Sequence, residues 1–256
     1  MRNAWLIPHT AAGSFAASGW NGQLRRRTQA EDSRLGSNPW RSATPAARVS
    51  ARSAPSRPGS AHARRVVHDR GDDVDLAAAE IHAAQFLEAL GVSLESESLR
   101  GTPGRMARAY AELFSPRPFD LTTFPNDEGY DELVLARGIP VRSVCEHHLL
   151  PFVGVAHVGC LPGECILGLS KLARVVDHFA RRPQVQERLT KQVADWLAER
   201  VHPKGIGVAI EAEHTCMTLR GVQATGSSTV TSTLLGTLRE DARSRQEFFA
   251  LTGVNP

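Results

Sequence analysis

The grouping of strand-like segments constrains the fold of this chain more than any other feature. Two alternating runs typical of strands, 133–144 and 152–161, are followed by two helical stretches, 169–182 and 185–201. Three more strand-like runs come next, at 206–213, 217–222 and 229–235. Strands grouped in pairs around a helical block predict an α+β fold with an antiparallel sheet, because a parallel sheet requires alternating βαβ units.

Two helices are expected ahead of these strands, in an N-terminal helical region over 75–115. The first, 75–90, carries apolar residues along one face and ends before a glycine. Those apolar residues are Leu76, Ile81, Phe86 and Leu90. The second begins near Thr102-Pro103, where Thr suits the cap and Pro the first turn. The Pro-, Asp- and Gly-rich segment 115–131 predicts a loop, and 240–251 a closing helix.

Residues 1–70 differ from the rest in charge and composition. They hold twelve Arg and no Lys against three acidic residues, a charge of +9, so the remaining residues carry −6 of the overall +3. The segment is rich in Arg, Ser, Ala, Pro and Gly without a period of 2 or 3.6, which predicts disorder. A transit peptide or translated upstream sequence would look similar. Since the positive charge lies in this tail, no nucleic-acid partner is expected.

The apolar content predicts a soluble, cytoplasmic protein. No stretch approaches the ~20 apolar residues that span a bilayer, so no membrane partner is expected. The four cysteines all follow residue 140, in a chain of 256 residues that is much larger than small disulfide-stapled secreted domains. Metal binding or plain thiols are therefore the better interpretations of these cysteines.

One cluster of soft and borderline donors predicts a zinc site. Cys145 and His148 lie three residues apart after a predicted strand, so one short loop can supply both ligands. His and Cys crowd together again at 214–216, which makes Cys216 the natural third ligand. Three protein ligands leave a position for water, as in catalytic zinc sites, whereas structural sites are closed by four.

Two other interpretations of the cysteines stay open. An isolated Cys-x-x-His is common by chance, and buried thiols often serve as small apolar core residues. Alternatively, Cys160 and Cys165 could complete a closed structural site of four thiolates. Cys160 lies in an apolar strand-like run and Cys165 beside a predicted turn, which favours the core interpretation for both.

Four separate motifs resemble those of GTP cyclohydrolase I in their order and spacing. They are CEHH at 145–148, GLSKLAR at 168–174, RPQVQERLT at 182–190, and HTCM at 214–217 followed by Arg220-Gly221. Thr102-Pro103 with Arg105 is similar to a more N-terminal motif of that family. The resemblance covers roughly 76–251, whereas the tail before about residue 70 resembles nothing in the family.

The resemblance implies an activity, a fold and an assembly. The implied reaction is zinc-dependent hydrolysis of GTP at C8 of guanine, with release of formate and rearrangement to 7,8-dihydroneopterin triphosphate. This is the first step of tetrahydrofolate and pterin biosynthesis. The implied fold over 74–256 is the tunnelling fold, a four-stranded antiparallel sheet backed by helices. Its subunits are expected to form a homodecamer, a dimer of pentamers, with active sites between subunits.

The resemblance also assigns roles around the proposed Zn²⁺. His147 and His214 match the catalytic histidines and could protonate N7 of guanine and shuttle protons during ring opening. Glu146 could orient a histidine through a hydrogen bond. Ser170 could carry a proton in the ribose steps.

Substrate recognition is expected to divide between base and phosphates. Glu187 could accept both N1–H and N2–H₂ of guanine, while Gln186 could bind the neighbouring O6 edge. The triphosphate needs several cations. The expected ones are Lys171, Arg174, Arg220 and Arg105. No G-x-x-x-x-G-K-[ST] loop is present, so phosphoryl transfer of the switch-GTPase kind is not expected.

Two competing functions stay open at this point. The chain could be another tunnelling-fold enzyme acting on a different purine or pterin triphosphate, although the presence of Glu187 disfavours it. It could also be a non-catalytic zinc-stabilised assembly. The presence of His147 and His214 disfavours that, because a purely structural site does not require them.

Overall fold

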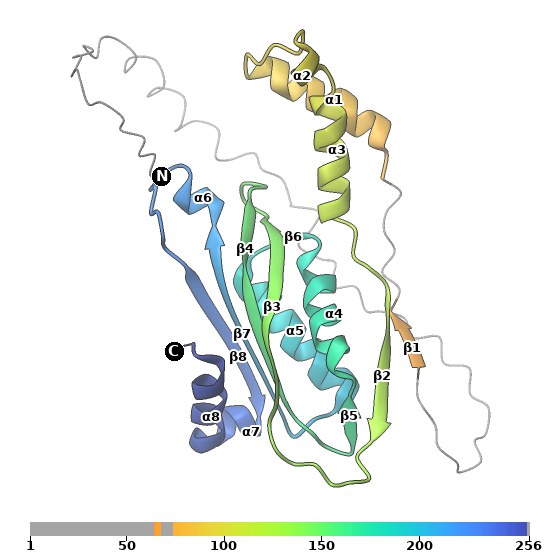
Figure 1. The fold of residues 1–256 in the computed structure, drawn as a ribbon, viewed down its shortest axis with the longest axis vertical. Coiled ribbons are helices and arrows are strands. Elements are labelled where there is room, and N and C mark those ends of the chain that lie inside the picture. The colour runs from red at the N-terminus through yellow and green to blue at the C-terminus, as the bar shows by residue number, and fades with distance from the viewer. Residues whose placement is uncertain (1–63, 68–73, 255–256) are drawn as a thin grey trace, which may run out of the picture. The chain divides into compact units, whose positions relative to one another are not determined.

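The computed structural model describes residues 64–67 and 74–254 (Figure 1). Of the tail over 1–70, which we expected to be disordered, the described part is strand β1 (Arg64–Val67). The rest of the tail, with its transit-peptide and start-site interpretations, lies outside the described residues. No helix within the described ranges has the length and apolar character required to cross a membrane.

The main sheet has five strands in the order β6-β3-β4-β7-β8. Neighbours pair antiparallel, except for a short parallel pairing between β3 and β6. The α+β class is therefore confirmed, and a two-residue strand extends the expected four-stranded sheet to five. The strands are β3 (Val134–Cys145), β4 (Pro151–Leu161), β6 (Pro183–Gln184), β7 (Gly205–His214) and β8 (Thr229–Gly236).

A second, three-stranded sheet contains an element that the sequence did not predict. Its order is β1-β2-β5, with β2 at Phe119–Pro125 and β5 at Cys165–Leu167. The expected loop over 115–131 thus contains a strand. The alternation of Phe119 and Leu121, both buried, with half-buried polar neighbours was the available signal, which the surrounding Pro, Asp and Gly residues outweighed.

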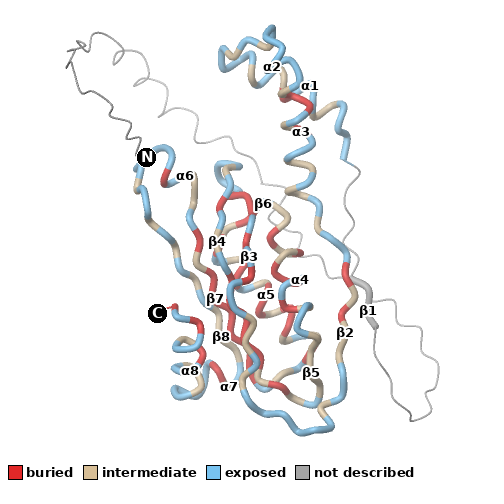
Figure 2. Tube along the Cα trace, in the orientation of Figure 1, coloured by how far each residue is buried: buried red, intermediate tan, exposed pale blue. Residues whose placement is uncertain are grey.

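Two helices cover one face of the main sheet and form the larger core with it (Figures 1 and 2). They are α4 (Leu169–Ala180) and α5 (Gln186–Val201). Each has a buried apolar stripe at helical spacing, such as Leu189, Val193 and Leu197 on α5. This stripe packs against inward-facing residues of β3, β4 and β7, which fixes the positions of the strand ends that carry the predicted zinc ligands.

The opposite face of the sheet is covered at one end by α7 (Thr237–Glu240) and α8 (Ala242–Thr252). The ring of Phe248 fills the space above Gly159 and Gly207, where an added Cβ would lie 2.9 Å and 2.8 Å from ring carbons. Glycine at both positions therefore permits this close approach.

The two expected N-terminal helices form, together with a short one that was not expected, and they leave an apolar face exposed. The helices are α1 (Leu76–Ala89), the short α2 (Glu97–Arg100) and α3 (Thr102–Leu113), and α1 lies against α3. Thr102 was expected to cap α3 but is its first helical residue, after the N-cap Gly101. The apolar residues predicted along the first helix are 42–64% exposed in the single chain. They are Leu76, Ile81, Phe86 and Leu90.

One expected strand is wrong. The run 217–222 is not a strand but the end of helix α6 (Thr215–Thr218) and a turn, with positive φ at Gly221 and Gln223. Leu219 and Val222 are 74% and 73% exposed, so the alternating pattern faces no core. An apolar alternation without a buried face does not stabilise a strand.

Candidate functional site

The three predicted metal ligands come from two neighbouring strand ends. Cys145 is the last residue of β3, and His148 lies in the turn that leads into β4. Cys216 lies in α6, directly after β7. In the antiparallel pairing of β4 with β7, Phe152 lies opposite His214. The two segments therefore meet at the same end of the strands.

The ligand atoms of Cys145, His148 and Cys216 all lie within 4.8 Å of one another. The Sγ atom of Cys145 is 3.9 Å from Nδ1 of His148. Cys145 is buried, Cys216 is half-buried and His148 is exposed, so the cluster opens to solvent on the His148 side. The triad is the only group of this kind in the described ranges, and neither Cys160 nor Cys165 belongs to it.

The two thiols of the cluster influence each other. Burial raises the pKa of Cys216, and the neighbouring Cys145 raises it further, whereas the positive charge of Arg220 lowers it. Two converging thiols favour a bound cation once they are deprotonated, and the positive charge of Arg220 favours the thiolate form of Cys216. Cys160 differs, because burial alone raises its pKa to about 11, as expected of an inert core thiol.

Two anchors hold the loop that carries Cys145 and His148. The Tyr110 hydroxyl donates a 3.0 Å hydrogen bond to the carbonyl of Leu149, whose φ of 53° is left-handed. Arg188 donates to Glu146 and to the carbonyl of Pro183. Neither Tyr110 nor a loop role for Arg188 was evident from the sequence, because both depend on contacts between distant segments.

His147 lies beside the cluster and is exposed to solvent. Its Nδ1 is 3.8 Å from Sγ of Cys145, and its Nε2 is 4.0 Å from Oε1 of Glu146. The carboxylate of Glu146 is held in turn by Arg188. The predicted acid–base histidine is therefore accessible, with a fixed carboxylate on its far side.

His214 lies in a more enclosed setting on the other strand end. Its ring stacks on Phe152, with centroids 4.5 Å apart and an angle of 13° between the planes. Burial lowers the pKa of His214, and the negative charge of Glu187 opposes that shift. The ring is thus neutral more readily than an exposed histidine.

Gln186 and Glu187, predicted together to bind guanine, have different environments. Gln186 is 1% exposed, and its amide already has partners at both ends, including His214. Glu187 is exposed at the first turn of α5, close enough to His214 for its charge to act there. Of the two, Glu187 is the side chain available to a base.

The predicted phosphate ligands do not all gather at the metal cluster of the same chain. Ser170, Lys171 and Arg174 lie in the first turns of α4, whereas the metal loop lies near its other end, beside β6 (Figure 1). A twelve-residue helix is about 18 Å long. Arg220 lies near Cys216.

Arg105 has local partners. Its guanidinium donates to the carbonyl of Ser98 and to the hydroxyl of Thr102, both at 2.7 Å. These bonds hold the turn between α2 and α3. No contact of Arg105 within the described residues connects it to the metal cluster or to α4.

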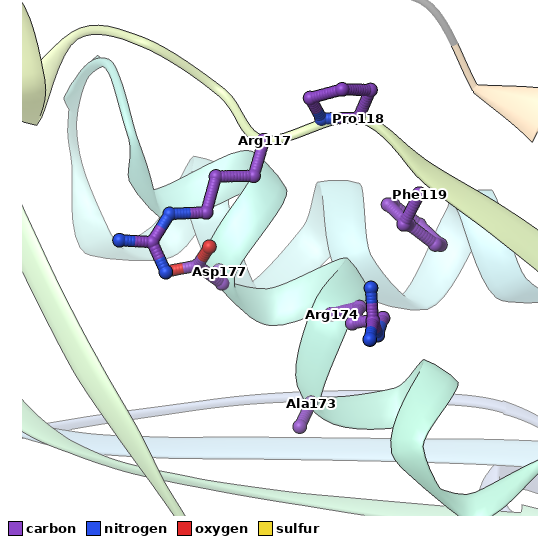
Figure 3. A pocket seen from close by; sticks show the side chains of 6 residues that line it. All are labelled: Arg117, Pro118, Phe119, Ala173, Arg174 and Asp177. Atoms are coloured by element: carbon purple, nitrogen blue, oxygen red, sulfur yellow. The ribbon is translucent and has the colours of Figure 1, made fainter.

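A surface pocket of about 350 Å³ lies between α4 and the start of β2 (Figure 3). Its polar lining consists of Arg174, predicted as a phosphate ligand, together with Arg117 and Asp177. The Nε of Arg181 donates to both oxygens of Asp177, at 3.0 and 3.1 Å, so that carboxylate is already paired. The pocket lining therefore carries two guanidinium groups beside a carboxylate that Arg181 already pairs. Arg117 was missed because it lies in the segment that was expected to be a loop.

Comparison with known proteins gives one consistent result. The family model described as GTP cyclohydrolase I matches residues 79–253. GTP cyclohydrolase 1 of Streptomyces avermitilis is 53% identical over 178 residues, which cover 68% of this chain and 88% of that protein. The Aquifex aeolicus protein of the same name is 50% identical over 166 residues, which cover 65% of this chain and 90% of that protein. The GTP cyclohydrolase 1 of Mycobacteroides abscessus is 48% identical over 189 residues, which cover 72% of this chain and 93% of that protein.

Proposed function

Because the chain belongs to the GTP cyclohydrolase I family, we propose that Cys145, His148 and Cys216 hold the zinc ion of a GTP cyclohydrolase. The chain is an enzyme of pterin and folate biosynthesis. Its reaction is hydrolysis of GTP at C8 of guanine, with release of formate and rearrangement to 7,8-dihydroneopterin triphosphate. The observation that carries the proposal is the convergence of three donor atoms within 4.8 Å, beside two histidines.

The donor set suits zinc. Two thiolates and one imidazole are preferred zinc ligands, and bond lengths of about 2.0–2.3 Å fit donor atoms that lie less than 4.8 Å apart. Softer or harder metals are less well matched by this combination. When bound, zinc supplies the Lewis acidity that activates water near neutral pH. The exposed position of His148 leaves room for substrate on that side.

His147 is proposed to exchange protons with N7 of guanine. C8 becomes a good electrophile only when N7 is protonated, so the site needs an acid within hydrogen-bond reach of the ring. His147 is exposed beside Cys145 and has Glu146 on its far side, 4.0 Å from Nε2. Arg188 fixes Glu146, so the carboxylate can orient the imidazole.

Glu187 is proposed to recognise the base. Its carboxylate is exposed at the start of α5, near His214, and can accept from both N1–H and N2–H₂ of guanine. The expected binding of O6 by Gln186 would require its buried amide to leave the partners described above. His214 is proposed as the second proton carrier.

The triphosphate is proposed to bind Lys171, Arg174 and Arg220, with Ser170 as a proton carrier in the ribose steps. Arg117 shares the pocket of Arg174 and is added to this group. The first turns of α4 lie about 18 Å from the end of the helix that is next to the metal loop. A single chain therefore does not bring all these groups to one substrate. A site completed by a second subunit resolves this, and the expected contribution of Arg105 stays a prediction.

Two features support an oligomer. Strand β8 is an edge of the main sheet, with one side available for pairing with another chain. Apolar side chains are exposed on α1 and also on β4 and β8, where they include Val153, Val155 and Val230. We propose the tunnelling fold for the domain over 74–256 and a homodecamer built from two pentamers. A cytoplasmic location stays a prediction.

Incubation of the zinc-loaded protein with GTP tests the activity. Formate should appear, together with a pterin that fluoresces after oxidation and dephosphorylation, and zinc should be present at one ion per chain. Absence of formate from protein that is fully loaded with zinc would refute the enzyme. A monomer with full activity at high dilution would refute the shared site.

A further inference from the structure

The orientation of the Gln186 side-chain amide follows from its partners. Nε2 lies 3.0 Å from the carbonyl of Ile210 and 2.8 Å from that of Thr229. Carbonyl oxygens only accept hydrogen bonds, so the amide NH₂ must face them and Oε1 must face the other way. Oε1 therefore points to His214, whose Nε2 is 2.8 Å away.

The neighbouring hydroxyl groups agree with this orientation. Thr190 Oγ1 donates to the backbone carbonyl of Gln186 at 2.8 Å, so it must accept from Thr231 Oγ1, which is 2.6 Å away. Thr231 Oγ1 is then free to accept from Gln186 Nε2 at 3.2 Å. The two hydrogens of Nε2 serve the two carbonyls, with Thr231 Oγ1 as a longer third contact, and a rotated amide would leave both carbonyls facing an oxygen.

The network fixes the histidine tautomer. Because Gln186 Oε1 can only accept, Nε2 of His214 must carry a hydrogen, and in the neutral ring Nδ1 then holds the lone pair. The stacking on Phe152 holds the plane of the ring, and a half-turn within that plane would put Cε1 in place of Nε2 and lose the hydrogen bond to Gln186. Gln186 is 1% exposed, so water does not compete for this bond.

We infer that Gln186 is a positioning residue that holds His214 in the Nε2–H form and leaves Nδ1 as the nitrogen that exchanges protons with substrate. This inference rests on the proposed role of His214 in the reaction. It replaces recognition of guanine O6 by Gln186, because a side chain with both amide ends bonded inside the protein does not reach the base. The Nε2–H bond is the same whether or not Nδ1 carries a proton, so the ring keeps its place throughout.

Nitrogen NMR of histidine-labelled, zinc-loaded protein tests the tautomer without any need for activity. His214 should show the pattern of an Nε2–H imidazole in the wild type, at a pH where the ring is neutral. In Gln186→Leu, which matches the side chain in size but cannot accept, the signal should shift toward a mixture of tautomers. An Nδ1–H pattern in the wild type overturns the inference even if the variant fails to fold.

Steady-state kinetics separates positioning from base recognition. Gln186→Leu should lower kcat by about 10- to 100-fold, with the KM for GTP changed less than threefold and zinc content unchanged. Thr231→Val is the matched control, because it removes one member of the network without touching His214, and its kcat should fall less than fivefold.

The outcomes distinguish this inference from the proposed function. A large rise in KM with unchanged kcat in Gln186→Leu would assign the residue to substrate binding and overturn the positioning role. Absence of formate from the wild type would overturn the proposed function, whereas the NMR result would still decide the tautomer.

Discussion

The hydroxyl of Tyr110 donates a 3.0 Å hydrogen bond to the carbonyl of Leu149, and so ties α3 to the loop that carries two metal ligands. This contact connects the N-terminal helical region to the chemistry. A loop with a left-handed residue depends on such anchors, since that conformation costs free energy at a residue other than glycine.

Tyr110→Phe should weaken zinc binding. The substitution keeps the ring, which contacts Phe114 at 5.6 Å between centroids, but removes a hydrogen bond contributing about 0.5–1.5 kcal/mol. The expected loss of zinc affinity is about two- to tenfold, measured by competition with a chelator. The chain's other tyrosine, Tyr130, provides the control as Tyr130→Phe, which should leave the affinity unchanged. Equal affinities in all three proteins would show that the anchor does not support the metal loop.

Metal content and turnover should respond differently to the two kinds of site residue. Cys216→Ala removes a ligand, so both zinc and formate production should be lost. His147→Ala should retain zinc and lose about 10²- to 10⁴-fold in kcat, as expected for a proton-transfer group. Zinc per chain and formate release are the two measurements. Cys165→Ala is the control and should keep both, whereas full zinc content in Cys216→Ala would require a different ligand set.

The pocket beside α4 predicts a binding effect for Arg117. Replacement of Arg117 or Arg174 by Ala should raise the KM for GTP by about tenfold with little change in kcat, because a charge-assisted hydrogen bond contributes about 1.5–3 kcal/mol and both guanidinium groups are solvent-exposed. The effect should shrink at high salt. Lys191→Ala, which removes an exposed charge paired with Asp195, is the control. An unchanged KM in Arg117→Ala would exclude it from the phosphate site.

Sequence patterns predicted the elements whose side chains alternate against a core. The β3–β4 hairpin, α4 and α5 form where expected, within a few residues. Each of these elements buries one face, and that burial produces the apolar periodicity in the sequence. Strand β2 was missed because the surrounding Pro, Asp and Gly residues indicated a loop. The run 217–222 was mistaken for a strand because its apolar residues alternate, although they face no core.

The metal ligands were accessible to sequence reasoning because zinc chemistry restricts both residue type and spacing. The buried hydrogen-bonding role of Gln186 could not be predicted from the sequence. A polar residue in the first turn of an amphipathic helix looks the same in the sequence whether it faces a ligand or a buried carbonyl. Its partners on β7 and β8 are more than twenty residues away in the chain. Only the folded arrangement brings them together.

His157 predicts how stability depends on pH. It lies in β4 at 7% exposure, and its Nδ1 has no hydrogen-bond partner among the described residues. Burial lowers its pKa, the positive charge of Arg137 on β3 lowers it further, and Glu211 on β7 opposes the shift. The neutral imidazole is therefore favoured in the folded state.

The sign of the effect follows from proton linkage. The unfolded chain binds a proton near the ordinary histidine pKa of about 6.5, while folded His157 does so only at lower pH. The free energy of unfolding should thus be insensitive to His157 above pH ~7 and should fall as the pH drops from there, by at most about 1.4 kcal/mol per pH unit. His214, whose pKa is also lowered, contributes in the same direction.

His157→Gln should make the free energy of unfolding less dependent on pH below about 7. Denaturant unfolding of the zinc-loaded protein at a fixed concentration, compared at pH ~7 and ~5, measures the slope. His82→Gln is the control, because His82 is exposed on α1 and its loss should leave the slope unchanged. If His157→Gln and wild type lost equal stability over this range, protonation of His157 would not be linked to unfolding, and the acid sensitivity would have to come from other groups.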